Sequence, residues 1–404
     1  MIHRFIRYPL NLIRAILSQC ITIDTAWLLQ HPSQHLAMEV TSMRSVLLTF
    51  LLGCLYQTSV LALQPSTQVR VSDLNSPWAV AWVDSEVVLI TERPGRLLRI
   101  DLQTGTRQEV TGLPPIAAIG QGGLLDVAVD PQFSTNRWIY FSLTAGQGGQ
   151  IGTELWRARL VNAELQELTR LFAMTPKSSG GRHFGSRIVF ERDDLLWLTL
   201  GDRGDQDRAQ RLDDHAGSVI RLHTDGRIPE DNPYRTVTGA RPELFSIGHR
   251  NIQGAFRHPD TGALWTHEHG PQGGDELNLT QAGKNYGWPI ITYGRNYGLG
   301  TPIGEGTEKP GMEQPKTIWV PSIAPSGMTY YTGNRLAQWT GQVFLGALRG
   351  QHLVRLQLDD SQRVIASERL FENKLGRIRD VRTGPDGGLY VLTDGPRSQL
   401  IEIV

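Results

Sequence analysis

The chain has 404 residues, and its 40 basic and 40 acidic side chains give a formal net charge of zero. A neutral chain lacks the basic surface that nucleic acids and anionic membranes attract, so we expect a small, uncharged partner and no nucleic acid. Apolar residues make up 40% of the chain, which is typical of a globular protein, and 43 glycines favour an all-β fold with many tight turns.

The N-terminal segment has the features of an export signal. Arg44 precedes an apolar run over residues 45–56, and Val60 and Ala62 are small residues at the positions that a signal peptidase reads. The run is shorter than the about 20 residues that a transmembrane helix needs. We therefore expect residues 1–62 to be an upstream extension followed by a signal peptide, and the mature protein to lack an integral membrane span.

The mature chain is expected to begin near Leu63 and to be periplasmic or secreted. Two alternatives remain open: residues 1–42 form a genuine leader or anchor helix, or Cys54 is the lipidated residue of a lipoprotein signal. The two cysteines, Cys20 and Cys54, both precede the expected start. A mature chain of this kind has no disulfide framework.

From position 76 onward, one pattern repeats: a short apolar strand, a turn with Asp or Gly, and a second apolar strand. The six copies are "WAVAWVDSEVVLITE", "LLDVAVDPQFSTNRWIYFSL", "SRIVFERDDLLWLTLGD", "GAFRHPDTGALWTHE", "GMTYYTGNRLAQWTGQVFLGAL" and "DVRTGPDGGLYVLTD". Several are followed by a further strand, which gives units of roughly 45–70 residues, a period typical of propeller blades. We predict a six-bladed β-propeller of four-stranded antiparallel blades, a single domain over residues 63–404.

Closure of the ring is also predicted from the two ends of the mature chain. The early strand "QVRVSDL" can complete the sheet that ends in "QLIEIV", which leaves no exposed sheet edge. A β-sandwich is the alternative architecture, but sandwich strands do not recur with a shared hairpin signature.

The loops around these hairpins carry the candidate catalytic and ligand-binding residues. His183, in "GGRHFGSR", lies among small residues just before an apolar strand, where its near-neutral pKa suits a general base; a structural or exposed histidine is the alternative. Arginines recur at equivalent points of other hairpins, and their forks recognise carboxylates bidentately, although each arginine alone could instead form a surface salt bridge. These arginines and an adjacent asparagine are Arg250, Asn251, Arg349, Arg377 and Arg379.

A glycine-rich turn, "EHGPQGGDELNL", offers oxygen ligands. It contains Glu268, Asp275 and Glu276, together with the backbone carbonyls of Gly270 and Pro271. Hard oxygen ligands suit calcium, although the spacing is not that of an EF-hand loop, and a turn with solvated acids is the alternative.

Taken together, these motifs resemble the glucose/sorbosone dehydrogenase family, and within it the bacterial aldose sugar dehydrogenases related to soluble PQQ glucose dehydrogenases. The resemblance spans nearly all of residues 70–404 and is carried by "GQGGLLDVAVDPQF", "HFGSR", "LGDRGD", "GHRN", "HGPQGGDELN", "GKNYGWP" and "RIRDV" in this order. It implies a six-bladed propeller that holds the quinone cofactor PQQ over its channel.

The resemblance also implies roles for individual residues. His183 is implied as the general base that takes the proton of the anomeric hydroxyl while hydride passes to PQQ, which yields a lactone. Calcium is implied at the carbonyls of Gly270 and Pro271, with a further position at Glu276 and Tyr286. The residues implied to surround the cofactor are Gln121, Arg250, Asn251, Tyr297, Arg349, Arg377 and Arg379.

Two positions depart from the soluble glucose dehydrogenases. An acid before the histidine and a lysine near the cofactor are replaced here by Arg182 and Arg349. Arg182 cannot orient His183 as a carboxylate would, so glucose does not follow as the preferred substrate and the identity of the aldose stays open. An unidentified electron acceptor is also implied, and the chain is expected to be a monomer or a homodimer.

Two other functions fit a six-bladed propeller. One is a calcium-dependent lactonase of the gluconolactonase type, which would coordinate its metal with Glu, Asn and Asp side chains at the channel. The other is a non-catalytic propeller that binds glycan or protein. A bound quinone changes its absorbance when an aldose is added, and neither alternative would show this change.

Overall fold

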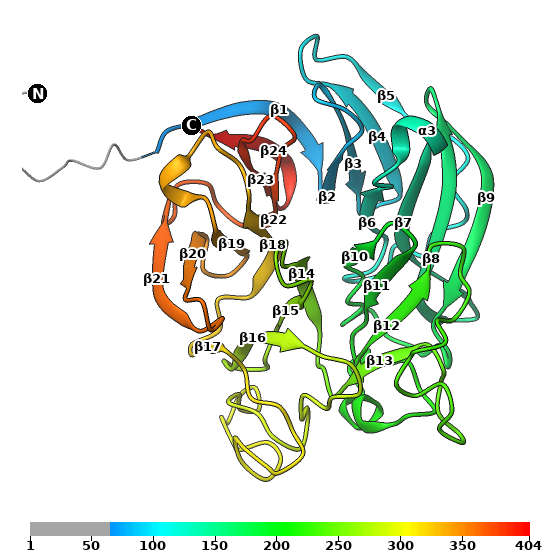
Figure 1. The fold of residues 1–404 in the computed structure, drawn as a ribbon, viewed down its shortest axis with the longest axis vertical. Coiled ribbons are helices and arrows are strands. Elements are labelled where there is room, and N and C mark those ends of the chain that lie inside the picture. The colour runs from blue at the N-terminus through cyan, green and yellow to red at the C-terminus, as the bar shows by residue number, and fades with distance from the viewer. Residues whose placement is uncertain (1–64) are drawn as a thin grey trace, which may run out of the picture. The chain divides into compact units, whose positions relative to one another are not determined.

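The computed structural model describes residues 65–404, which form six four-stranded antiparallel sheets arranged in a ring (Figure 1). The predicted six-bladed propeller is therefore confirmed. The expected leader over residues 1–62 and the expected start near Leu63 lie outside the described residues. Within residues 65–404, no helix is long and apolar enough to cross a membrane.

Each blade consists of consecutive strands, with one exception at the ends of the chain. The sheet orders are β2-β3-β4-β5, β6-β7-β8-β9, β10-β11-β12-β13, β14-β15-β16-β17, β18-β19-β20-β21 and β22-β23-β24-β1. The strands are β1 (Thr67–Asn75), β2 (Pro77–Trp82), β3 (Val87–Glu92), β4 (Arg96–Asp101), β5 (Arg107–Glu109), β6 (Leu124–Val129), β7 (Trp138–Gln147), β8 (Gln150–Val161), β9 (Glu164–Ala173), β10 (Ile188–Arg192), β11 (Leu195–Thr199), β12 (Ser218–His223), β13 (Leu244–Ile247), β14 (Ile252–Arg257), β15 (Leu264–Glu268), β16 (Asp275–Thr280), β17 (Thr317–Trp319), β18 (Pro325–Tyr331), β19 (Gln342–Ala347), β20 (Leu353–Leu358), β21 (Val364–Leu370), β22 (Ile378–Thr383), β23 (Leu389–Thr393) and β24 (Pro396–Ile403). Short helical segments lie in loops: α3 (Phe133–Asn136), η1 (Gln206–Gln210) and η2 (Ala337–Trp339).

The six hairpins recognised in the sequence are the first two strands of the six blades. Second strands such as β3 are buried along their whole length, because a neighbouring blade covers each face of the sheet. An outer strand such as β9 is mostly exposed. This difference explains why the inner hairpins read as continuous apolar runs whereas the outer strands are harder to recognise.

Apolar packing is concentrated between neighbouring blades. Leu89 of the first blade packs in one cluster with Phe141 of the second, and Tyr331 of the fifth blade packs with Val391 of the sixth. The first strands of successive blades contact one another around the ring.

The ring is closed by the two ends of the described chain. Strand β1 pairs antiparallel with β24, with Thr67 opposite Ile403, and Arg70 forms an ion pair of 2.7 Å with the buried Glu402. The predicted closure is confirmed. It replaces two free sheet edges with a continuous ladder.

A buried charge network lies among the first strands. Arg187 Nη1 is 2.9 Å from Asp126 and 3.3 Å from Asp380, and Arg382 bonds the same two carboxylates at 3.0 and 2.9 Å. Each charge has two opposite partners, which offsets the cost of removing it from water. The Arg187 guanidinium also lies 4.2 Å from the centre of the ring of Trp78, a residue that lines the central cavity, so the network packs directly beneath the lining of that cavity.

Candidate active site

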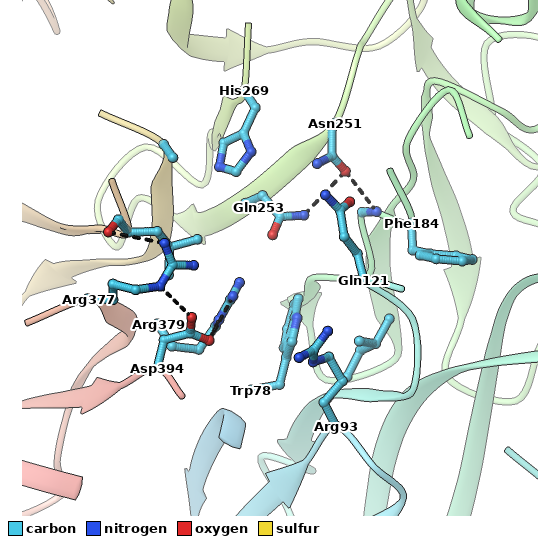
Figure 2. A pocket seen from close by; sticks show the side chains of 14 residues that line it. Trp78, Arg93, Gln121, Phe184, Asn251, Gln253, His269, Arg377, Arg379 and Asp394 are labelled. Atoms are coloured by element: carbon cyan, nitrogen blue, oxygen red, sulfur yellow. Dashed lines mark hydrogen bonds and ion pairs between the residues drawn. The ribbon is translucent and has the colours of Figure 1, made fainter. Parts of the chain in front are cut away.

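A cavity of about 330 Å³ opens where the six blades meet (Figure 2). Every blade contributes to it with residues at the start of its first strand or just after its second strand. These two positions meet at one rim because the strands are antiparallel. The lining residues are Trp78, Arg93, Gln121, Leu125, Phe184, Gly185, Asn251, Gln253, His269, Ala324, Leu348, Arg377, Arg379 and Asp394.

One wall of the cavity is cationic. Arg377 Nε donates to Asp394 at 2.8 Å, and Arg379 donates to the other oxygen of the same carboxylate through Nε and Nη2 at 3.0 and 2.9 Å. Burial raises the pKa of Asp394, but the adjacent Arg379 and Arg377 outweigh burial and hold it below its usual value. Together with Arg93, which also lines the cavity, three guanidinium groups and one carboxylate leave the cavity lining a net positive charge (Figure 2).

The opposite wall carries amide side chains. Gln121 accepts a hydrogen bond from the backbone N–H of His183 at 2.8 Å. Asn251 Oδ1 accepts from the Gly185 N–H at 3.2 Å and from Gln253 Nε2 at 3.3 Å. These bonds connect the cavity wall to the loop that contains His183, as Figure 2 shows for Asn251.

His183 lies beside this wall and is paired with a carboxylate. Its Nδ1 is 2.6 Å from Asp202 Oδ1, and Asp202 also accepts hydrogen bonds from the Gly204 N–H at 2.7 Å and from Trp288 Nε1 at 2.8 Å. Burial raises the pKa of Asp202, but the bond with His183 and the other donors hold it below its usual value. An ionised carboxylate only accepts, so Nδ1 carries the proton and Nε2 keeps its lone pair.

The environment also keeps the imidazole neutral. Burial lowers the pKa of His183, and the positive charges of Arg250 and Arg182 lower it further. The hydrogen bond with Asp202 raises this pKa but does not outweigh them. A neutral imidazole with an oriented Nδ1–H is the resting state of a general base. Within the described residues, no hydrogen bond engages Nε2.

A second imidazole, that of His269, lines the cavity itself. Its Nε2 is 2.6 Å from the carbonyl oxygen of Pro325, which can only accept, so Nε2 carries the proton. Burial lowers the pKa of His269 to about 3. The ring is therefore neutral throughout the physiological range.

Arg250 is buried behind His269 and is held by carbonyl oxygens. Its Nη1 donates to the carbonyls of His269 and Gly270 at 3.0 and 2.8 Å, and its backbone N–H donates to Glu268. The guanidinium lies 5.4 Å from the centre of the Trp288 ring. Arg250 therefore contacts both the backbone of His269 and the ring of Trp288, the residue that donates a hydrogen bond to Asp202.

A small cavity of about 10 Å³ lies next to Arg250, and its walls include Glu268, Gly270, Glu276 and Tyr286. Burial, together with the negative charge of Glu268, raises the pKa of Glu276 to about 8. The volume is close to what one water molecule needs. Two neighbouring carboxylates around such a space favour a cation. Among residues 65–404, however, no group of three or more His, Cys, Asp and Glu side chains is arranged to hold a metal.

The structure brings together most of the residues expected from the sequence. Gln121, Asn251, Arg377 and Arg379 line the main cavity, and Gly270, Glu276 and Tyr286 line the small one, with Arg250 between them. The remaining three lie elsewhere: Arg349 is exposed, Tyr297 is 69% exposed, and Pro271 is buried outside both linings. Their assigned roles stay predictions. Asp275 accepts hydrogen bonds from Gly270, Ser322, Ile323 and Ala324, which makes it a turn-stabilising residue.

Sequence reasoning missed several functional positions. Asp202 is the carboxylate bonded to His183 Nδ1, a position that Arg182 does not take, and the motif "LGDRGD" that contains it could have indicated this. Asp394, which directly follows β23, pairs with both Arg377 and Arg379. A single acidic residue at the end of a strand forms no motif that the sequence alone would reveal. Other lining residues that were missed include the polar or aromatic side chains of Trp78, Arg93, Phe184, Gln253 and His269.

The chain is similar in sequence and in fold to known sugar dehydrogenases. The family description "Glucose / Sorbosone dehydrogenase" matches residues 74–402. Aldose sugar dehydrogenase YliI of Escherichia coli is 40% identical over 362 residues, which cover 88% of this chain and 97% of that protein. The apo-form structure of the soluble aldose sugar dehydrogenase from Escherichia coli is 39% identical, with a TM-score of 0.81 over 84% of this chain and 99% of that one.

A relative with bound cofactor is also similar. The PQQ-bound aldose sugar dehydrogenase from Streptomyces coelicolor is 26% identical, with a TM-score of 0.69 over 84% of this chain and 99% of that one. The family match spans nearly all of the described residues. The chain is thus a member of the glucose/sorbosone dehydrogenase family.

Proposed function

We propose that this protein is a PQQ-dependent dehydrogenase that oxidises aldoses at the anomeric carbon to lactones, with His183 as the general base. The observation that carries the proposal is the His183–Asp202 pair, 2.6 Å apart, beside a cavity that presents three arginines. PQQ-bound and sugar-oxidising relatives of the same fold support it.

The cavity suits PQQ, which is a planar molecule with three carboxylates. Arg93, Arg377 and Arg379 supply forked donors for carboxylates, and Gln121 and Asn251 supply amide groups on the facing wall. Asp394 stays paired with two of the arginines and keeps them extended in fixed orientations. When bound, PQQ supplies the redox chemistry by accepting two electrons from the sugar.

The protein's part in the reaction is proton removal and orientation. His183 Nε2 accepts the proton of the anomeric hydroxyl, and Asp202 stabilises the imidazolium that forms. Trp288 and the Gly204 N–H hold Asp202 in the orientation that fixes the ring. His269, neutral and with a free Nδ1 acceptor, adds a second hydrogen-bonding group to the cavity.

Calcium is the proposed metal. The carbonyl of Gly270 and the carboxylate of Glu276 border the small cavity together with Tyr286, and Pro271 follows in the same turn. Gly270 tolerates no side chain, because an added Cβ would lie 2.2 Å from the Gly273 carbonyl oxygen. We further propose export to the periplasm or beyond and an as yet unidentified electron acceptor.

The test is reconstitution of the purified apoprotein with PQQ and calcium. Bound quinone should be bleached when aldoses are added, and an artificial dye should be reduced in a screen over neutral and substituted aldoses. Hydrolysis of sugar lactones is the matched assay for the alternative enzyme class. Lactone hydrolysis without aldose-dependent bleaching would refute the proposal, and so would failure of the apoprotein to bind PQQ.

A further inference from the structure

The loop before β10 holds His183 in an unfavourable backbone conformation. His183 has a φ of 54°, in the left-handed region that side chains other than glycine seldom adopt, between Gly180 at 90° and Gly185 at 64°. Such a conformation persists only where surrounding contacts enforce it. Gln121 accepts a hydrogen bond from the His183 N–H, and the Gln121 backbone N–H donates to the Gly181 carbonyl at 2.7 Å.

Arg203 provides further contacts to this loop. It is 4% exposed, its Nη2 donates to the Gly180 carbonyl at 2.7 Å, and its Nη1 donates to the Arg182 carbonyl. Its backbone N–H donates to the His183 carbonyl at 3.3 Å, and its guanidinium lies 3.5 Å from the centre of the Phe184 ring. One side chain thus bonds or stacks on residues on both sides of the histidine.

The residues next to Arg203 and in contact with it also belong to the site. Asp202, the preceding residue, holds the imidazole ring, whereas Arg203 holds the backbone from which that ring extends. Phe184, which lies against the guanidinium, is also part of the cavity wall. The dipeptide 202–203 therefore links the base, its loop and the wall of the cavity through separate contacts.

We propose that Arg203 is a positioning residue that clamps the loop over residues 180–184 and fixes His183 relative to the cavity. The catalytic consequence rests on the function proposed above. A base misplaced by about 1 Å can lose about 100-fold in rate, because proton transfer requires hydrogen-bond geometry. The clamp itself is a property of the apoprotein and can be measured without turnover.

The experiment compares Arg203→Met, which keeps an unbranched apolar stem but removes the charge and the donors, with Arg203→Lys, which keeps the charge but lacks the fork that reaches two carbonyls. The control is Arg211→Met, an exposed arginine of the following loop that pairs with Asp213. Amide hydrogen exchange of the peptide over 178–187 is measured on folded apoprotein, with β11 as an internal reference. PQQ affinity and the rate of reduction of bound PQQ by an aldose are measured on the same preparations.

Arg203→Met should speed exchange in this peptide at least about 10-fold and slow reduction about 10- to 100-fold at saturating sugar. PQQ affinity should change less than about 3-fold, because the arginines of the cavity remain. Arg203→Lys should fall between Met and wild type, and it replaces Met if that variant does not fold. Unchanged exchange, or faster exchange with an unchanged reduction rate, would overturn the clamp. Lack of reduction in wild type would instead overturn the proposed function and leave the exchange result to decide the clamp.

Discussion

Replacing Asp202 by Asn removes one acceptor from a carboxylate that accepts three hydrogen bonds. Oδ1 accepts from His183 Nδ1 and the Gly204 N–H, and Oδ2 accepts from Trp288 Nε1. If the Asn oxygen faces His183, its NH₂ group meets the indole N–H of Trp288, donor against donor. If the amide flips, Nδ1 must accept, so the proton moves to Nε2 and the base is lost.

Both orientations reduce the population of correctly oriented neutral base. General-base catalysis contributes about 100- to 10,000-fold, so we expect the rate of reduction of bound PQQ to fall by a factor in that range. This corresponds to about 3–5 kcal/mol of transition-state stabilisation. PQQ affinity should be nearly unchanged, because Asp202 is not part of the cavity lining.

The assay is stopped-flow reduction of PQQ-saturated protein by an aldose, followed by absorbance. Asp213→Asn is the matched control, since Asp213 is exposed and pairs with the exposed Arg211. A reduction rate for Asp202→Asn within about 3-fold of wild type, on folded protein, would refute the role of this carboxylate in orienting the base.

The remaining predictions concern the base, the cofactor site, the metal and the mature terminus. Because burial lowers the pKa of His183 below the usual 6.5, the reduction rate should be constant above pH 6.5 and fall only as the pH drops through that lowered pKa. His183→Gln should lower the rate about 100- to 10,000-fold and remove this acid limb from the residual rate, which stopped-flow measurements across pH would show. Arg379→Ala should weaken PQQ binding by roughly 2–5 kcal/mol, and an unchanged affinity measured by calorimetry would contradict the assigned cavity. Glu276→Gln should weaken calcium binding to the apoprotein, and an unchanged calcium titration would place the metal elsewhere. N-terminal sequencing of exported protein should show a start near Leu63, and a lipidated Cys54 would establish the lipoprotein alternative.

The fold was predictable because its signals are local. Each inner hairpin is a contiguous apolar run interrupted by a turn, and six such runs at similar spacing define six blades. The closing pair β1 and β24 was predictable for the same reason, since the segments at both ends of residues 65–404 carry strand patterns outside the six hairpins.

The sequence by itself also determined which loops carry chemistry, because glycine-rich turns with His183, Asn251 or Arg379 depart from the pattern of the strands around them. Tertiary structure decided which of these side chains meet. Asp202 is 19 positions from His183, and Asp394 is 15 from Arg379, and only the convergence of antiparallel strand ends at one rim brings each acid to its partner. It also separated residues that sequence reasoning grouped together. Arg349 follows the second strand of its hairpin and Arg379 lies at the start of the first strand of another, yet one is exposed and the other lines the cavity. Spacing along a strand fixes the face of the sheet on which a side chain lies. How far a loop residue lies from the ring axis depends on the packing of whole blades, and no local pattern encodes it.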